Sequence, residues 1–239
     1  MQSSDHPTAS GSNPRSRLRE VLIDLEPGAK PSIIKDRYSA LAAGYDTTCG
    51  RILSIRARAI NALALRAGET VADVACGTGA TLTTVAARVG DTGRALGIEL
   101  CPAMAAQAAL RIEHAGIGGW TEVLVSPVET FATDCRFDAL LFCYTHDVFQ
   151  SEGALANLFR HAKPGARVSV AGMRFLPWWW GFGHNLFTGY RARNYLSTFH
   201  GLREPWHLLK RWCPDFRVVH TEHAGTSYHG VGTVSHLSA

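Results

Sequence analysis

The chain has 239 residues, of which 46% are hydrophobic and 18% are charged, and this composition excludes a disordered protein. The length suffices for one α/β domain with short additions but not for two independent cores. The formal net charge is only +4, which argues against a protein that coats nucleic acid. Residues 1–30 are polar and predict a disordered or loosely attached lead-in, so we assign residues 31–239 to one domain.

Two helices are expected before the first strand. Pro31 opens a helix over residues 32–41, and Gly44 breaks it. Apolar residues at helical spacing over residues 52–63, with arginines on the opposite face, predict a second helix that ends at Gly68.

From residue 70 onward, apolar strands alternate with helices. The expected strands are 70–75, 94–99, 121–125, 138–143 and 166–171, and the expected helices are 80–88, 102–114 and 152–162. Lys163–Gly165 predicts a stop and turn before the fifth strand, and residues 216–221 and 228–234 predict a final antiparallel pair. Such a pattern predicts a doubly wound, mostly parallel, seven-stranded Rossmann-like α/β sheet.

Residues 174–212 interrupt this alternation with aromatic and basic side chains. Residues 174–217 hold 12 of the chain's aromatic residues, which number 6 Trp, 6 Tyr and 10 Phe, and seven Lys and Arg against two acids. We expect an insertion after strand five that walls an apolar ligand or packs as a small core of its own. Trp beside Arg is also typical of a segment that rests on anionic lipid, so weak contact with a membrane surface stays open.

Six cysteines at irregular spacing predict reduced, buried thiols rather than disulfides or a zinc ribbon. No stretch reaches the ~18 apolar residues of a spanning helix, and we expect a cytoplasmic protein. The histidines at positions 220, 223, 229 and 236 have no carboxylate or thiol beside them at fixed spacing, so we expect no metal.

The most informative segment is the glycine-rich turn after residues 70–75. Gly77 and Gly79 let the backbone bend and approach a ligand, and the following helix offers unpaired N–H groups. Glu99, at the end of the next strand, suits a pair of ribose hydroxyls. Leu82 stands where a dinucleotide site needs a third glycine, and there is no Walker lysine. A nucleoside ligand without a pyrophosphate is therefore expected.

These residues resemble class I S-adenosylmethionine-dependent methyltransferases, most closely their ubiquinone/menaquinone-biosynthesis-like small-molecule branch. Asp73–Gly79 is similar to the family's first motif, and Glu99 falls on its ribose-binding acid. Residues 137–141 look like its fourth strand, and Lys163–Gly165 resembles its approach to the fifth. The resemblance covers about residues 38–172.

The resemblance implies S-adenosylmethionine as the cofactor. Asp73 would orient the glycine loop or the methionine amino group, and Cys143 would offer its backbone carbonyl to that group. Ser126 replaces the family's acid at the adenine amino group, so Val128 would supply a backbone donor there. The full cofactor-binding set is Tyr45, Asp73, Ala75, Cys76, Gly77, Gly79, Glu99, Leu100, Met104, Ser126, Val128 and Cys143.

The resemblance also implies in-line methyl transfer to an amine, hydroxyl or carbon of a small, largely apolar or aromatic metabolite. Such transfer needs mainly proximity and the exclusion of water, and a hydroxyl acceptor benefits from a base. His146 is the first candidate base, with Tyr144 beside it after the fourth strand. Because the family often inserts a substrate cap after strand five, the expected acceptor contacts are Tyr38, Asp147, Trp179, His184, Tyr190 and Arg193.

Two alternatives stay open. One is a phospholipid or quinone-precursor methyltransferase at a membrane surface, and the other is a catalytically silent nucleoside-binding scaffold, suggested by Ser126-Pro127. Nucleic-acid methylation is not expected, because no Asp/Asn-Pro-Pro-Tyr-like motif follows the fourth strand. The expected partners are a small-molecule acceptor and no nucleic acid, in a monomer or homodimer.

Overall fold

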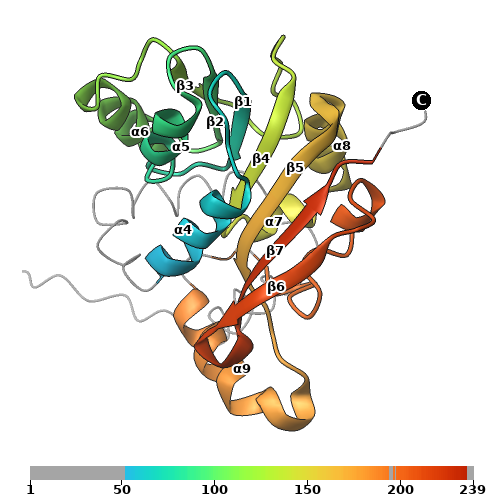
Figure 1. Ribbon diagram of the computed structural model, residues 1–239. Helices are drawn as coiled ribbons and strands as arrows, with labels where there is room; N and C mark the ends of the chain where they lie inside the picture. The colour runs from blue at the N-terminus through green and yellow to red at the C-terminus, as the bar shows by residue number, and fades with distance from the viewer. Residues whose placement is uncertain (1–51, 194–195, 197, 236–239) are drawn as a thin grey trace, which may run out of the picture.

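The computed structural model describes residues 52–193, 196 and 198–235. The helix expected over residues 32–41 lies outside this part of the chain, as do Tyr38 and Tyr45. The described helices and strands are, in chain order (Figure 1), α4 Leu53–Ala62, β1 Thr70–Val74, α5 Leu82–Val89, β2 Arg94–Glu99, α6 Pro102–His114, β3 Thr121–Val125, β4 Phe137–Cys143, α7 His146–Phe149, α8 Glu152–Arg160, β5 Ala162–Met173, α9 Trp178–Ala192, η3 Leu209–Arg211, β6 Arg217–Glu222, η4 His223–Gly225 and β7 Ser227–Thr233.

The strands of the described residues form one sheet in the order β3-β2-β1-β4-β5-β7-β6. Neighbouring strands from β3 to β5 are parallel, whereas β7 runs antiparallel to both β5 and β6. The predicted doubly wound, mostly parallel sheet with a final antiparallel pair is therefore confirmed. The chain runs outward from β1 in one direction and from β4 in the other, and open α/β sheets bind ligands at the carboxyl ends of strands at such a switch point.

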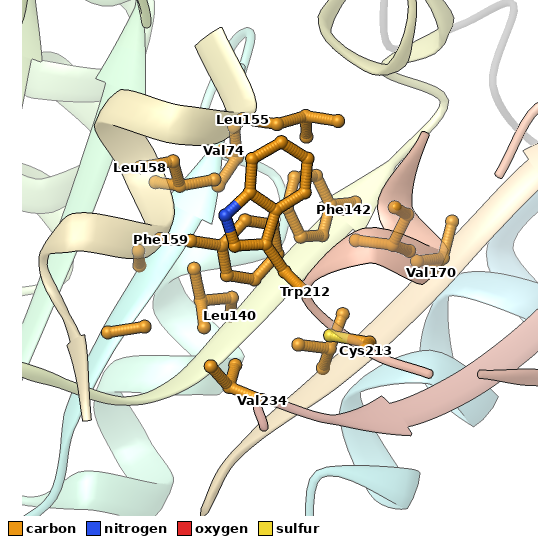
Figure 2. Packing of buried hydrophobic residues seen from close by; sticks show 14 of the residues in the cluster. Val74, Leu140, Phe142, Leu155, Leu158, Phe159, Val170, Trp212, Cys213 and Val234 are labelled. Carbon is orange, nitrogen blue, oxygen red and sulfur yellow. The ribbon is translucent and has the colours of Figure 1, made fainter. Parts of the chain in front are cut away.

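Apolar side chains cover both faces of the sheet. In β1, Val71 belongs to the cluster packed under α4 and α5, whereas Ala72 and Val74 belong to the cluster on the other face. In that second cluster, Trp212 stacks on Phe159 with ring centres 5.5 Å apart, as Figure 2 shows. The strands are thus buried on both sides, as the apolar pattern requires.

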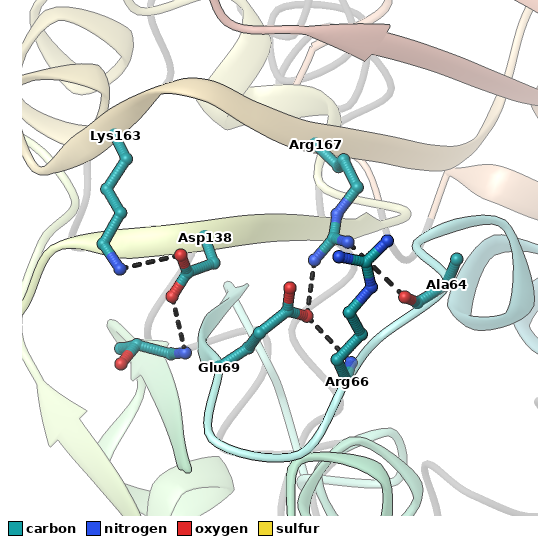
Figure 3. Close-up of polar contacts among 7 residues, drawn as sticks. Ala64, Arg66, Glu69, Asp138, Lys163 and Arg167 are labelled. Atoms are coloured by element: carbon teal, nitrogen blue, oxygen red, sulfur yellow. Dashed lines mark hydrogen bonds and ion pairs between the residues drawn. The ribbon is translucent and has the colours of Figure 1, made fainter.

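The amino ends of the central strands are held by ion pairs (Figure 3). Lys163 lies 2.7 Å from Asp138, whose other carboxylate oxygen accepts a hydrogen bond from the Thr70 N–H at 3.0 Å, and Arg167 lies 2.5 Å from Glu69. These contacts stabilise the edge of the sheet formed by the amino ends of the strands. The switch point lies at the opposite edge, formed by the carboxyl ends.

The turn expected at Lys163–Gly165 is a bulge inside β5. Ala162 pairs with Phe137, but the next pair is Arg167 with Ala139, so β5 carries extra residues at this point. Gly165 has φ +78°, a conformation that favours glycine. Pro164 has no N–H for a regular ladder, so the strand begins four residues earlier than predicted and bulges around it.

No helix within the described part of the chain combines the length and the apolar character needed to cross a membrane.

Candidate functional site

The glycine-rich turn connects β1 to α5 at the switch point. Ala75, Gly77 and Gly79 have φ values of +51°, +58° and +72°. A Cβ on Gly79 would lie 2.8 Å from the Cβ of Ala108, so glycine is required where the turn rests on α6. A Cβ on Gly77 would meet nothing within 4 Å. The backbone at Gly77 therefore faces open space, where a ligand can approach closely.

Glu99, the last residue of β2, holds this turn in place. Its Oε2 accepts a hydrogen bond from the Gly77 N–H and its Oε1 accepts one from the Cys101 N–H, both at 2.8 Å. Burial raises the pKa of Glu99, and the hydrogen bonds from backbone N–H groups oppose that rise. A carboxylate offers about four acceptor positions. Both oxygens can therefore accept a further hydrogen bond, as a pair of neighbouring ribose hydroxyls requires.

Asp73 lies beneath the turn, fully buried in β1. The Thr81 hydroxyl donates a hydrogen bond to its Oδ2. Burial raises the pKa of Asp73 to about 7, although the hydrogen bond from Thr81 and the positive charge of Arg56 both lower it. The positive charge of Arg56 therefore acts on this buried carboxyl group of β1.

Arg56 corrects the prediction that the arginines of the first described helix lie on its outer face. Its side chain is buried with Ile55, Ala59 and Ile60 on the inner face of α4. Its positive charge lowers the pKa of Asp73, and the ionised form of this carboxyl group compensates for burying a cation. The sequence contained a signal, because position 56 lies four residues before Ile60, within the apolar stripe.

The remaining predicted cofactor residues lie at the ends of the neighbouring strands. Cys143 ends β4, and burial raises the pKa of its thiol to about 12, which keeps it protonated. The Ser126 N–H donates to the Glu99 carbonyl at 3.0 Å, and the Val128 carbonyl accepts from Asn157 at 2.9 Å, so the loop after β3 is held beside β2. Met104 is covered by protein on α6, which makes Leu100 the better placed to flank an adenine.

Tyr144 begins a chain of hydrogen bonds that reaches the surface. Its hydroxyl donates to the Ser227 Oγ at 3.4 Å, and this oxygen lies 3.0 Å from the Nδ1 of the exposed His223. Tyr144, His223 and Ala224 have φ values of +61°, +52° and +55°. Such backbone strain concentrates at functional sites. Burial raises the pKa of Tyr144 to about 12, so its phenol is neutral at physiological pH.

Ser227 and His223 are missing from the sequence-derived site. His223 was considered only as a metal ligand, and Ser227 was not considered at all. β7 runs antiparallel to β5, so it begins at the edge of the sheet where the parallel strands end. The predicted final antiparallel pair therefore already placed the first residues of β7, including Ser227, at this edge. Within the described residues, no group of three or more His, Cys, Asp or Glu side chains is arranged to hold a metal ion.

His146 begins α7 and lies almost fully buried. Its Nε2 is 2.9 Å from the carbonyl oxygen of His200, so that nitrogen carries the proton. Its Nδ1 is buried and has no hydrogen-bond partner among the described residues. Burial lowers the pKa of His146 to about 4, so the imidazole is neutral and is a weaker base than the sequence suggested. Asp147 follows it in the same short helix.

The other described acceptor contacts lie on α9 or directly after it and point outward. Trp179 is 85% exposed and Tyr190 is 65% exposed, and His184 and Arg193 are also exposed. The structure does not bring these four side chains to the glycine turn, since α9 projects from the sheet near the start of β7 (Figure 1). Side chains that wall an acceptor site would be at least partly buried, whereas these four are exposed to solvent.

Asp73 predicts a free energy of unfolding that falls as the pH rises. Its pKa is about 7 in the folded chain against an ordinary value of 3.8. Between about pH 4 and pH 7 the folded state keeps a proton that the unfolded state loses, so stability decreases by an amount on the order of 3–4 kcal/mol across this window. Urea denaturation at several pH values checks this. Asp73→Asn should flatten the slope, and parallel profiles for the variant and the wild type would contradict the assignment.

A protein-family model described as a methyltransferase domain matches residues 71–165, from β1 into β5. This segment contains the glycine turn, Glu99 and the end of β4. The match agrees with the resemblance to class I S-adenosylmethionine-dependent methyltransferases that the sequence predicts. The sheet order and the glycine turn described above lie within or beside the matched segment.

A relative of known sequence matches part of the chain, and solved structures share its fold. The chain is 30% identical over 113 residues to the ubiquinone/menaquinone biosynthesis C-methyltransferase of Enterobacter sp. (strain 638), covering 46% of this chain and 45% of that protein. It thus spans less than half the length of that relative. A solved methyltransferase from Aquifex aeolicus has a TM-score of 0.58 at 20% identity, covering 87% of this chain and all of that chain. A chain of the Haloferax volcanii complex of the Trm112 activator with a methyltransferase has a TM-score of 0.64 at 14% identity, covering 83% of this chain and 98% of that chain.

Proposed function

We propose that this chain binds S-adenosylmethionine and transfers its methyl group to a small, largely apolar or aromatic acceptor. The observation that carries the proposal is the contact between Glu99 and the glycine turn. The Glu99 carboxylate accepts hydrogen bonds from Gly77 and Cys101 and keeps acceptor capacity on both oxygens, directly beside the open space above Gly77. This arrangement suits a nucleoside whose ribose presents two adjacent hydroxyls.

The cofactor would be held along the carboxyl edge from β2 to β4. Glu99 would bind the ribose, and the segment around Leu100, Ser126 and Val128 would contact the adenine. Asp73 would attract the methionine ammonium group, and Arg56, whose charge acts on Asp73, would attract the carboxylate. Ammonium binding would favour the ionised form of Asp73, so affinity should rise as the pH increases through about 7.

When bound, the cofactor supplies an activated methyl group, and the chain must hold the acceptor in line with it and exclude water. For a hydroxyl acceptor the protein must also remove a proton. We propose that Tyr144 receives a hydrogen bond from the acceptor and passes a proton through Ser227 to His223, which is exposed to solvent. His146 would accept a hydrogen bond at its unpartnered Nδ1 and so orient the acceptor.

This proton path predicts a specific loss of turnover. Tyr144→Phe and Ser227→Ala should lower kcat by about 10- to 100-fold while leaving affinity for S-adenosylmethionine nearly unchanged, because both act on the acceptor proton. Transfer of a labelled methyl group to a panel of apolar phenols and alcohols measures this. Ser227→Thr keeps the hydroxyl and should restore much of kcat. Wild-type turnover in both Tyr144→Phe and Ser227→Ala would contradict the path, and an absence of labelled product from every acceptor class would count against the proposed activity.

Three further parts of the proposal follow from the chemistry of the chain. A small-molecule acceptor is favoured over nucleic acid, since outside residues 174–217 the formal charge is −1, that is +4 minus the segment's surplus of +5.

A cytoplasmic location is favoured by the five described cysteines, all of them free thiols. A silent nucleoside-binding scaffold is the alternative function, and labelled product would exclude it.

A further inference from the structure

Helix α9 exposes an unusual number of large apolar side chains. Trp179 is 85% exposed, Leu186 66% and Tyr190 65%. The other large apolar residues exposed on this helix are Trp178, Trp180, Phe182 and Phe187. An exposed patch of this kind normally marks an interaction surface.

The two faces of α9 are distinct. Its buried residues, Gly181, Asn185 and Ala192, lie at helical spacing on one face, toward the protein. The exposed residues Trp179, Phe182, Leu186 and Tyr190 recur at intervals of three or four on the other face, along a helix of about 22 Å. The apolar surface is therefore a continuous stripe that faces away from the protein.

The inner face of α9 packs on Leu176, in the segment that leads into the helix. The Asn185 side chain accepts a hydrogen bond from the Leu176 N–H at 2.7 Å and donates one to the Leu176 carbonyl at 2.8 Å. A Cβ on Gly181 would lie 2.3 Å from the Leu176 Cβ, so the helix approaches this segment as closely as glycine allows. These contacts cover the inner face of the helix and leave the stripe exposed.

The charged side chains in the chain segment that carries the stripe have one sign. No acidic residue occurs between Glu152 and Glu204, whereas residues 174–203 contain four arginines. The Arg191 guanidinium lies 5.7 Å from the centre of the Phe187 ring, and that of Arg193 lies 3.8 Å from the centre of the Tyr190 ring. Cations therefore lie at the border of the apolar stripe, where an anionic headgroup would meet them.

We propose that α9 is a docking helix for the surface of a bilayer that contains anionic lipid. Trp and Tyr rings are suited to the boundary between headgroups and acyl chains, and arginines attract anionic headgroups. Amphipathic helices that carry Trp, Phe and Leu on one face with basic residues beside it lie in the plane of the interface. The inference goes beyond the proposed methyl transfer and does not depend on it. It places the molecule on a membrane, where apolar acceptors are concentrated.

Vesicle binding by the full chain tests this proposal. Vesicles of phosphatidylcholine alone are compared with vesicles that also contain phosphatidylglycerol, and bound protein is measured by co-sedimentation. Binding should require phosphatidylglycerol, weaken as salt is added, and fall about tenfold for Trp179→Ala and about threefold to tenfold for Leu186→Ala. Arg191→Gln should weaken binding about fivefold, whereas Arg217→Gln on β6 should not.

Leu110→Ala on α6 is the matched control, because Leu110 is also an exposed leucine on a helix. It should bind vesicles like the wild type. Calorimetric binding of S-adenosylhomocysteine by Leu186→Ala should be unchanged, so a failure of docking and a failure of the proposed function are distinguishable. The proposal is overturned if no vesicles bind or if Leu186→Ala and Leu110→Ala bind equally. It is also overturned if sedimentation velocity shows a dimer that Leu186→Ala dissociates and that binds no vesicles, because a second copy would then cover α9.

Discussion

Replacing Glu99 with alanine should reduce the affinity for S-adenosylmethionine and S-adenosylhomocysteine by at least about 100-fold. The variant loses the charged acceptor for two ribose hydroxyls, and a hydrogen bond to a charged group contributes about 1.5–3 kcal/mol. It also frees the N–H groups of Gly77 and Cys101, which Glu99 binds at 2.8 Å, and so loosens the turn. Isothermal titration calorimetry measures both ligands directly.

Two control variants separate the ribose contact from general effects on the chain. Glu99→Gln keeps the shape of the side chain, but its amide group would place a donor against one of the backbone N–H groups, so affinity should also fall sharply. Glu122→Ala removes an acid from β3, where it faces Arg94 at 3.5 Å, and should leave affinity unchanged. Equal affinity in Glu99→Ala and Glu122→Ala would contradict the proposed ribose site.

Gly79→Ala should lower the free energy of unfolding by about 2–4 kcal/mol. The new Cβ would lie 2.8 Å from the Ala108 Cβ and 3.1 Å from its Cα, and the φ of +72° adds strain for any residue with a side chain. Urea denaturation measures the loss. Gly116 has a φ of +65° with open space around it, so Gly116→Ala reports the backbone strain alone. This control should lower the free energy of unfolding by only about 1 kcal/mol.

Gly77→Ala should affect ligand affinity more than the free energy of unfolding. Its Cβ meets no atom within 4 Å, so the stability loss should match that of Gly116→Ala, but the methyl group occupies the side of the turn where a ligand approaches. Affinity for S-adenosylhomocysteine should therefore fall although the fold is nearly intact. If Gly79→Ala and Gly116→Ala were equally stable, the close packing of the turn on α6 would be wrong.

The fold was predictable because its signals are local. Strands buried on both faces carry continuous apolar runs, and β2, α6 and β3 begin and end where the sequence predicts. The bulge at Lys163–Gly165 was not predictable from local signals. Proline and glycine there indicate a break, but only the pairing of β5 with Phe137 shows that the strand continues through it.

The parts of the site formed by residues close together in the sequence were predictable. The parts formed by contacts between distant segments were not. The glycine turn and Glu99 follow from spacing within a βαβ unit. The cation beside Asp73 comes from α4, and Ser227 is 83 residues away from Tyr144 in the chain, so neither contact leaves a local pattern. The exposure of Trp179 was also not predictable, because the sequence does not show whether an aromatic cluster lines a cavity or faces solvent.

Calorimetric titration of S-adenosylhomocysteine into the wild-type 239-residue chain tests the central claim most directly. It isolates binding from the identity of the acceptor and from any membrane contact. The geometry of Glu99, Gly77 and Asp73 predicts binding at a single site per chain, with an affinity that rises as the pH increases through about 7. An absence of binding by the folded wild-type chain across this pH range would contradict the claim.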